Sequence, residues 1–138
     1  MIARKRPKKG LDFLSYLEGE FILGLWDEDT KRFLLARDKL GRRHIYYSIK
    51  DNFLIFSSKI NHFFYYNFIE KDINLDALNL YFSFKYVPSP YTIFKDILKL
   101  PTASTIIWED GNLYTRKYWE VNIDRLGKKK KFEYDIAE

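Results

Sequence analysis

Four short apolar runs, each followed by a polar turn or a glycine break, constrain the fold of this chain most strongly. The runs are Phe21–Trp26, Phe33–Ala36, Ile45–Tyr47 and Phe53–Phe56. The first is nearly continuous in apolar residues, as in a strand covered on both faces. Polar residues 27–31, Gly41 and the pair Asp51-Asn52 separate the runs. Short strands joined by tight turns predict an antiparallel meander from about Glu20 to Ser57.

A different periodicity follows the meander. Residues from Ser58 to Tyr66 have helical spacing, with Ser57 or Ser58 available as an N-cap. Asn74 is a candidate N-cap for a second helix, because Leu75, Leu78, Phe82 and Tyr86 recur at steps of three or four. We therefore expect two helices between Ser58 and Tyr86.

Three shorter features complete the expected secondary structure. Residues Leu11–Leu17 favour a short helix that ends near Gly19. Residues Ile93–Leu98 favour a short turn or helical piece. Two apolar runs on either side of the turn at 109–112 predict a hairpin over residues 105–119.

The charges of the chain are concentrated at its two ends. Nine basic residues lie within 4–9 and 128–131, and the remaining 15 are outnumbered by 19 acidic residues. We interpret residues 1–10 as a basic arm, 11–119 as one folded domain and 120–138 as a charged tail. Solvated tails are the favoured interpretation, and nucleic-acid binding through the basic ends is the alternative.

The composition excludes several classes of protein. Hydrophobic residues make up 46% of the chain, which argues against disorder. No apolar run approaches the roughly 18 residues of a membrane helix, and the start does not resemble a signal peptide. The sequence contains no cysteine, which excludes disulfides, thiolate-bound metals and a cysteine nucleophile. We expect a cytoplasmic protein.

The candidate chemical groups favour structural roles. The two histidines, His44 and His62, belong to no cluster of metal ligands. The carboxylates at positions 27–29 are expected in a turn, and Ser57-Ser58 is expected to cap a helix. The aromatic residues 63–66 favour core packing or a protein interface over base stacking.

The charged stretch from Ala36 to Arg43 raises the strongest functional question. Arg37 and Asp38 lie at the end of an expected strand, as in the loop of an active site. The alternative is a pair that braces the turn or an interface, and we favour this bracing role. Under that interpretation, no residue of the chain is a catalytic, cofactor-binding or metal-binding residue.

Three motifs, in order, resemble those of glutamine-hydrolysing asparagine synthetases. The segments are LEGEFILGLWDEDTKRFLLARDKLGRRHIYY, FLIFSSKI and YVPSPYTIFKDILKLP. The family typically has a Trp-Asp strand end, then Ala-Arg-Asp-Arg-x-Gly, Phe-Ala-Ser-Glu-Ile and Val-Pro-x-Pro-x-Thr-Ile-Phe segments. The matching residues are Gly19, Phe21, Trp26, Asp27, Ala36, Arg37, Asp38, Gly41, Tyr46, Tyr47, Phe56, Ser58, Ile60, Val87, Pro88, Pro90, Thr92, Ile93, Phe94, Ile97, Lys99, Leu100 and Pro101.

This resemblance covers about residues 11–119 and implies an α+β fold. It implies part of the αββα sandwich of N-terminal-nucleophile hydrolases, followed by the connection to a synthetase domain. In the family, a cysteine after the initiator methionine releases ammonia from glutamine, and a second domain activates aspartate with ATP and magnesium. Here Ile2 follows Met1, and the Ser-Gly-Gly-x-Asp-Ser loop for pyrophosphate is absent. The chain also departs from the family at His44 and at Lys59, where the family has proline and glutamate.

We therefore expect a fragment of an asparagine synthetase that is inactive alone and binds no cofactor itself. The alternative is a non-catalytic binding module with basic termini that contact nucleic acid or an acidic partner. The apolar strands exceed what two helices cover: Phe21, Leu23, Leu25, Phe33, Leu35, Tyr47 and Phe53–Phe56. We thus expect an uncovered sheet that binds a complementary synthetase chain or a second copy.

Overall fold

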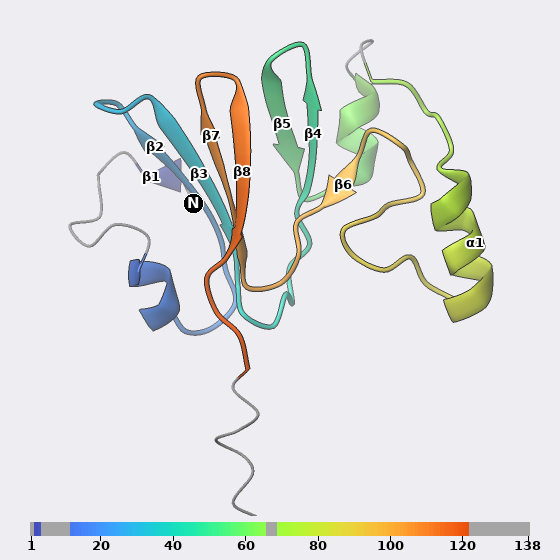
Figure 1. Cartoon of the computed structure of the whole chain (residues 1–138), viewed down its shortest axis with the longest axis horizontal. Helices are drawn as coiled ribbons and strands as arrows, with labels where there is room; N and C mark the ends of the chain where they lie inside the picture. The colour runs from blue at the N-terminus through green and yellow to red at the C-terminus, as the bar shows by residue number, and fades with distance from the viewer. Residues whose placement is uncertain (1, 4–11, 66–68, 122–138) are drawn as a thin grey trace, which may run out of the picture.

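The computed structural model describes residues 2–3, 12–65 and 69–121, and these form two β-sheets with three short helices (Figure 1). One sheet has five strands, in the order β1 (Ile2–Ala3), β2 (Ile22–Asp27), β3 (Arg32–Arg37), β7 (Ser104–Glu109) and β8 (Asn112–Lys117). The other has three strands, in the order β5 (Phe53–Ser57), β4 (Tyr46–Lys50) and β6 (Leu98–Lys99). The described chain is therefore α+β with largely antiparallel sheets.

The expected single meander is wrong. The hairpins β2–β3 and β4–β5 form as predicted, but they lie in different sheets. After Arg37 the chain leaves the first sheet and enters the second at Tyr46; we call residues 38–45 the crossover. The far edge of β3 pairs instead with β7 of the predicted hairpin. Sequential strands are not always neighbours, and here the later apolar strand takes the central place.

The remaining strands include two that the sequence did not predict. The two-residue strand β1 pairs in parallel with Gly24 and Leu25, within the segment expected as a loose arm. The rest of that arm lies outside the described residues. In the segment expected as a turn or helical piece, Phe94 forms an isolated bridge with Ile73, and β6 then pairs with β4.

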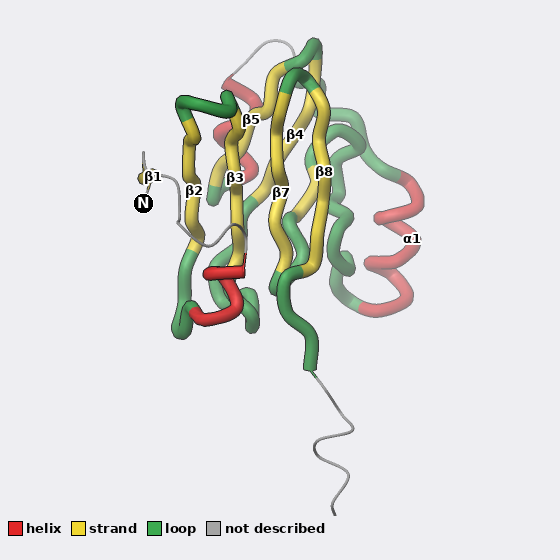
Figure 2. The backbone as a smooth tube through the Cα atoms, turned by 60° about the vertical axis from the view of Figure 1, so that its left-hand side comes forward, coloured by secondary structure: helices red, strands yellow, loops and turns green. Residues whose placement is uncertain are grey.

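The two sheets pack against each other around a shared apolar core. Leu35 of β3 and Ile106 of β7 contribute from the larger sheet, and Tyr47 of β4 from the smaller. Ile45 and Leu100 close the same cluster beside the crossover. Figure 2 shows β4 and β5 lying behind the plane of β7 and β8. Leu25, Leu35 and Tyr47, which were expected on an uncovered sheet, are buried.

Short helices cover the outer side of each sheet. The 3-10 helix η1 (Asp12–Tyr16) packs Leu14 against Leu25 and Leu34 of the larger sheet. The 3-10 helix η2 (Ile60–Tyr65) places Phe63 in a third cluster with Ile97, beside residues of β4 and β5. Both helices lie where the sequence predicted a helix, although each forms only 3-10 turns.

Helix α1 (Leu75–Phe84) begins and ends as its sequence indicates. The side chain of Asn74 accepts a hydrogen bond from the Ala77 amide at 3.1 Å, which confirms the predicted N-cap. Lys85 adopts a left-handed conformation with φ of 65° and closes the helix through its amide bond to Tyr81. Ala77 is the one buried residue of α1.

Candidate functional site

The Arg37 guanidinium ties the crossover to the second sheet. Arg37 is 3% exposed. Its Nε donates to the Arg43 carbonyl and its Nη1 to the Leu100 carbonyl, both at 2.6 Å, and Nη2 donates to the Gly41 carbonyl. Since Leu100 lies 63 residues along the chain, this side chain joins two distant segments. Burial lowers the pKa of Arg37, although the nearby Asp38 partly opposes this.

The Asp38 carboxylate shapes the start of the crossover. Its Oδ1 accepts hydrogen bonds from the amides of Leu40 at 3.1 Å, Gly41 at 2.6 Å and Arg42 at 3.4 Å. This is the turn-forming use of an aspartate side chain. The backbone of Asp38 is also hydrogen-bonded on both sides. Its amide donates to the Phe21 carbonyl, and its carbonyl accepts from the Ala103 amide. Asp38 is 1% exposed, so its carboxylate does not face a substrate from solvent.

Tyr118, just after β8, also forms a hydrogen bond to Arg37. Its hydroxyl donates to the Arg37 carbonyl at 2.8 Å, and its amide donates to Ala103. Burial, with the charge of Asp38 adding to it, raises the pKa of Tyr118 to about 12. The bracing role predicted for Arg37 and Asp38 is confirmed, and the two residues are buried rather than solvated.

Gly41 allows the crossover to pass close to Arg37. Its φ is 66°, a conformation that favours glycine. A Cβ at this position would lie 2.3 Å from Cγ2 of Thr102 and 2.9 Å from Nη2 of Arg37. The glycine of the family motif therefore has a packing reason in this fold.

His44 completes the group around the Arg37 guanidinium. Its Nδ1 lies 2.9 Å from Arg37 Nη2, and because arginine can only donate, Nδ1 accepts and the ring is neutral. Burial first, then the charges of Arg37 and Lys99, lower the pKa of His44 below its usual 6.5. Burial and Arg37 also lower the pKa of Lys99. His44 is thus an acceptor for the bracing arginine.

The other candidates from the sequence occupy structural positions. Asp27 Oδ1 accepts from the amides of Asp29 and Thr30, which confirms the turn assigned to residues 27–29. Ser57 Oγ accepts from the Lys59 amide at 3.2 Å, consistent with capping at the start of η2. His62 Nδ1 lies 2.9 Å from the same hydroxyl on the exposed surface. Lys59 is exposed and makes no ion pair within the described residues.

The aromatic residues at 63–66 divide between core and surface. Phe63 is buried, and Phe64 packs its ring edge-on against Phe94 with a centroid distance of 4.8 Å. Tyr65 is 79% exposed, and Tyr66 lies outside the described residues. Core packing is therefore confirmed for the two phenylalanines.

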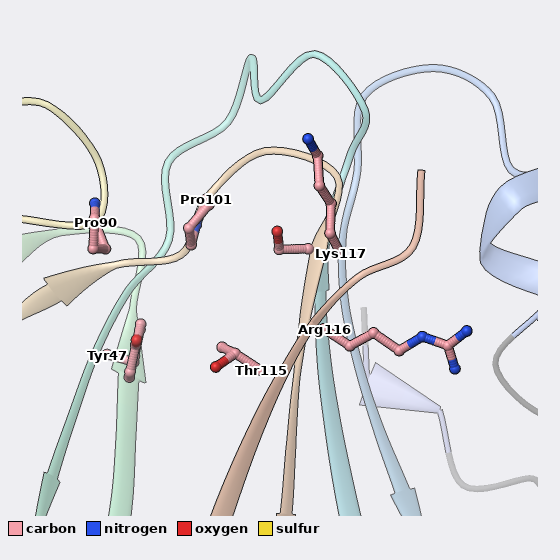
Figure 3. A pocket seen from close by; sticks show the side chains of 7 residues that line it. Tyr47, Pro90, Pro101, Thr115, Arg116 and Lys117 are labelled. Carbon is pink, nitrogen blue, oxygen red and sulfur yellow. The ribbon is translucent and has the colours of Figure 1, made fainter. Parts of the chain in front are cut away.

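A cavity of about 210 Å³ opens between β8 and the loops before and after β6. Its lining residues are Tyr47, Pro90, Pro101, Ser104, Thr115, Arg116 and Lys117. Figure 3 shows Tyr47 and Thr115 on its two sides, while the Arg116 side chain points away. Lys117 pairs with Glu120 at 2.7 Å. The cavity thus offers hydroxyl groups, apolar rings and, at its margin, the cations Arg116 and Lys117.

Within the part of the chain that the structure describes, no three histidine, cysteine, aspartate or glutamate side chains gather as a metal site would require. Among the same residues, no helix combines the length and apolarity needed to cross a membrane. The basic residues at 4–9 and 128–131 lie outside the described segments.

The sequence analysis did not identify several hydrogen-bond partners of Arg37. The carbonyl of Leu100 and the hydroxyl of Tyr118 are far from Arg37 along the chain. Lys99, Leu100 and Pro101 belong to the third family-like segment, so the resemblance was the one signal that linked this region to Arg37.

Comparison with known proteins identifies a family and several relatives of this chain. Residues 2–119 match the family model of the glutamine amidotransferase domain. A protein provisionally named asparagine synthetase (glutamine-hydrolyzing) 2, from Methanocaldococcus jannaschii, is 33% identical over 125 residues, covering 88% of this chain and 24% of the relative. Asparagine synthetase (glutamine-hydrolyzing) 1 of Bacillus subtilis is 31% identical over 111 residues, covering 78% of this chain and 17% of the relative.

A shorter match is to a protein named as an amidase. Amidase chry2 of Gibberella zeae is 41% identical over 54 residues, covering 39% of this chain and 8% of that protein. The chain therefore spans about a quarter or less of the length of these three relatives.

Proposed function

The chain belongs to the glutamine amidotransferase domain family, and on this premise we propose that it supplies scaffold to an asparagine-synthetase-type enzyme without hydrolysing glutamine itself. The observation that carries the proposal is the Arg37–Asp38 group. The most charged stretch of the family-like sequence is occupied in holding the two sheets together. Arg37 and Asp38 are buried, and the exposed side chains of Arg42 and Arg43 pair with Glu20.

The arrangement of layers supports the scaffold role. Helix η1 lies outside the larger sheet, the two sheets share a core, and η2 lies outside the smaller sheet. This order supports our proposal that the chain forms part of an αββα sandwich of the kind found in N-terminal-nucleophile hydrolases. In such a sandwich, a nucleophile placed near a strand end depends on the packed sheets for its position.

The chemistry of the residues supports the absence of glutaminase activity. The family reaction needs a nucleophile whose own amine or a neighbouring base activates it. Cysteine does not occur in the 138 residues. Among the described residues, no third group hydrogen-bonds to the His62 ring to orient it toward Ser57, so the Ser57 hydroxyl is a weak nucleophile.

We place the second half-reaction of the family, the activation of aspartate, outside the described residues. Activation of aspartate requires ATP and magnesium, and the described residues hold no cluster of oxygen ligands for the metal. We therefore propose that the cysteine and the ATP site of this family lie outside these 138 residues.

Ammonia release tests the proposal directly. The purified chain is incubated with glutamine, and ammonia and glutamate are measured by two separate assays. We expect neither product above buffer. Product formation that persists through repeated purification, and that disappears when the folded chain is replaced by an Arg37→Met variant, would overturn the proposal.

A further inference from the structure

Strand β8 leaves one edge of the larger sheet unpaired within the described residues. It is the last strand of that sheet, and its one strand partner there is β7. Figure 2 shows β8 at the margin of the sheet, with β7 on one side. Its six residues follow an unbroken register with β7 and include neither proline nor glycine. A bulge or a proline, which commonly blunts an edge strand, is therefore missing from β8.

Alternate residues of β8 direct their backbone groups toward this free edge. The Tyr118 amide, just after the strand, donates to the Ala103 carbonyl at 2.8 Å, so these two opposite residues form a hydrogen-bonded pair. Bonded and non-bonded pairs alternate along an antiparallel ladder, so the even-numbered residues of β8 bond to β7. The amides and carbonyls of the odd-numbered residues point the other way and bind no group of the described chain. These residues are Leu113, Thr115 and Lys117.

The cavity of about 210 Å³ lies beside the same edge. Thr115 and Lys117 line it from β8, whereas Tyr47, Pro90 and Pro101 line it from the smaller sheet and its loops. Figure 3 shows the Thr115 side chain on the side that faces Tyr47. The volume is below the roughly 300–1,000 Å³ of sites for drug-sized ligands, so the cavity suits a single apolar side chain better than a whole cofactor.

The two faces of β8 differ in shape and charge. On the cavity face, Lys117 pairs with Glu120 at 2.7 Å. On the outer face, the Arg116 side chain points away from the cavity and forms no ion pair within the described residues. No residue of β8 is acidic. Opposite residues of neighbouring strands share a face, so an added strand is complementary if it places an apolar residue beside Thr115 and an acidic residue beside Arg116.

We propose that β8 binds an extended peptide segment of another polypeptide, in which apolar residues alternate with acidic ones. The segment adds antiparallel to β8, since antiparallel pairing is slightly more stable per residue. Its backbone bonds to the free groups of the odd-numbered residues, a central apolar side chain enters the cavity, and an acidic side chain pairs with Arg116. The backbone bonds supply affinity, and the cavity and the cation supply selectivity. This recognition is independent of the scaffold role proposed above.

A fluorescent peptide of sequence Thr-Val-Glu-Leu-Glu-Val-Thr tests the proposal against the full chain. With its leucine opposite Thr115, one glutamate lies opposite Arg116. We expect saturable binding in fluorescence anisotropy, and in nuclear magnetic resonance spectra the amides of Leu113, Thr115 and Lys117 should shift. Replacing the peptide leucine by serine should weaken binding roughly tenfold or more, because the cavity then loses its apolar occupant. No saturable binding of the leucine peptide up to millimolar concentration would overturn the proposal.

Two variants of the chain test the edge and the cation separately. Thr115→Pro removes an amide that faces the free edge, so the ladder with β7 stays intact while peptide affinity falls roughly tenfold. Circular dichroism and the urea midpoint verify that this variant folds. Arg116→Glu should weaken the glutamate peptide roughly fivefold and favour Thr-Val-Lys-Leu-Lys-Val-Thr instead. Lys59→Glu, beyond β5, is the matched control and should change neither affinity. Equal affinities of the wild type, Thr115→Pro and Arg116→Glu for the glutamate peptide would overturn the proposal.

Sedimentation equilibrium without peptide distinguishes a peptide partner from a second copy of this chain. We expect no dimer through β8, because pairing two copies brings Arg116 from each to one interface and neither β8 carries an acid. A dimer that forms in the wild type and is lost in Thr115→Pro would overturn the proposal, since a second copy would then occupy the edge.

Discussion

The Arg37–Asp38 pair, where β3 meets the crossover, and helix α1 reverse the usual distribution of charged and apolar residues. Arg37 and Asp38 are charged, yet both are almost completely buried. Leu75 and Phe82 are apolar, yet about two thirds of each is exposed. The difference lies in the available partners. Backbone carbonyls accept from the Arg37 guanidinium and backbone amides donate to Oδ1 of Asp38, whereas Ala77 is the one buried residue of α1. Residue type alone therefore does not decide burial in this fold.

Removing the Arg37 guanidinium should have the largest effect on stability. Arg37→Met keeps much of the apolar stem but leaves the carbonyls of Arg43, Leu100 and Gly41 without their donor. We expect a loss of about 3–5 kcal/mol in the free energy of unfolding. Urea unfolding followed by tryptophan fluorescence measures this loss.

Arg42→Met is the matched control for that prediction. Arg42 pairs with Glu20 at 2.7 Å, but its side chain is 66% exposed. Solvent screens such a pair, so the midpoint of urea unfolding should stay close to that of the wild type. Equal losses in the free energy of unfolding for Arg37→Met and Arg42→Met would show that burial does not determine how much each arginine stabilises the fold.

The sequence predicted the local elements well because their signals are local. The Asn74 cap, the three hairpin turns and the positions of η1, η2 and α1 all depend on residues within a few positions of one another. The sheet assignment depends instead on which strand pairs with β3. That choice follows from contacts with β7, about seventy residues along the chain.

The candidate site could be predicted only in outline. Adjacent Arg37 and Asp38 indicated a bracing pair, but the sequence did not identify Leu100 or Tyr118 as the groups they brace. Likewise, the spacing of Leu75, Leu78 and Phe82 predicted a helix but not which face would be covered. Burial of a helix face depends on the partner that packs there, and hydrophobic periodicity does not identify that partner.

Protonation of His44 should loosen the crossover by a moderate amount. In the folded chain its pKa lies below 6.5, because of burial and then the charges of Arg37 and Lys99. Arg43 is its neighbour in sequence, and the Tyr46 ring lies 6.3 Å away. Below its usual pKa, the unfolded chain binds a proton at His44 that the folded chain resists. The stabilisation is therefore complete above pH 6.5 and is lost as the pH falls through the lower folded value.

Urea unfolding at a series of pH values from about 7.5 to about 5.5 measures this loss. His44→Asn should remove the part of the pH dependence that belongs to this ring. His62→Asn, at the other histidine, should retain it. If the wild type and the His44→Asn variant show the same pH dependence, the ring does not couple to folding through Arg37.

The smallest effect should come from shortening an exposed leucine of α1. Leu75→Ala removes apolar atoms that are already in contact with water, and alanine favours a helix at least as well as leucine. We expect a change within about 0.5 kcal/mol in the free energy of unfolding. Leu100→Ala makes the same chemical change at a residue with 0% exposure and should cost about 2–5 kcal/mol. A large loss for Leu75→Ala at high dilution would mean that this face of α1 is covered within one chain, which would contradict both the exposure of the helix and the contrast with the crossover.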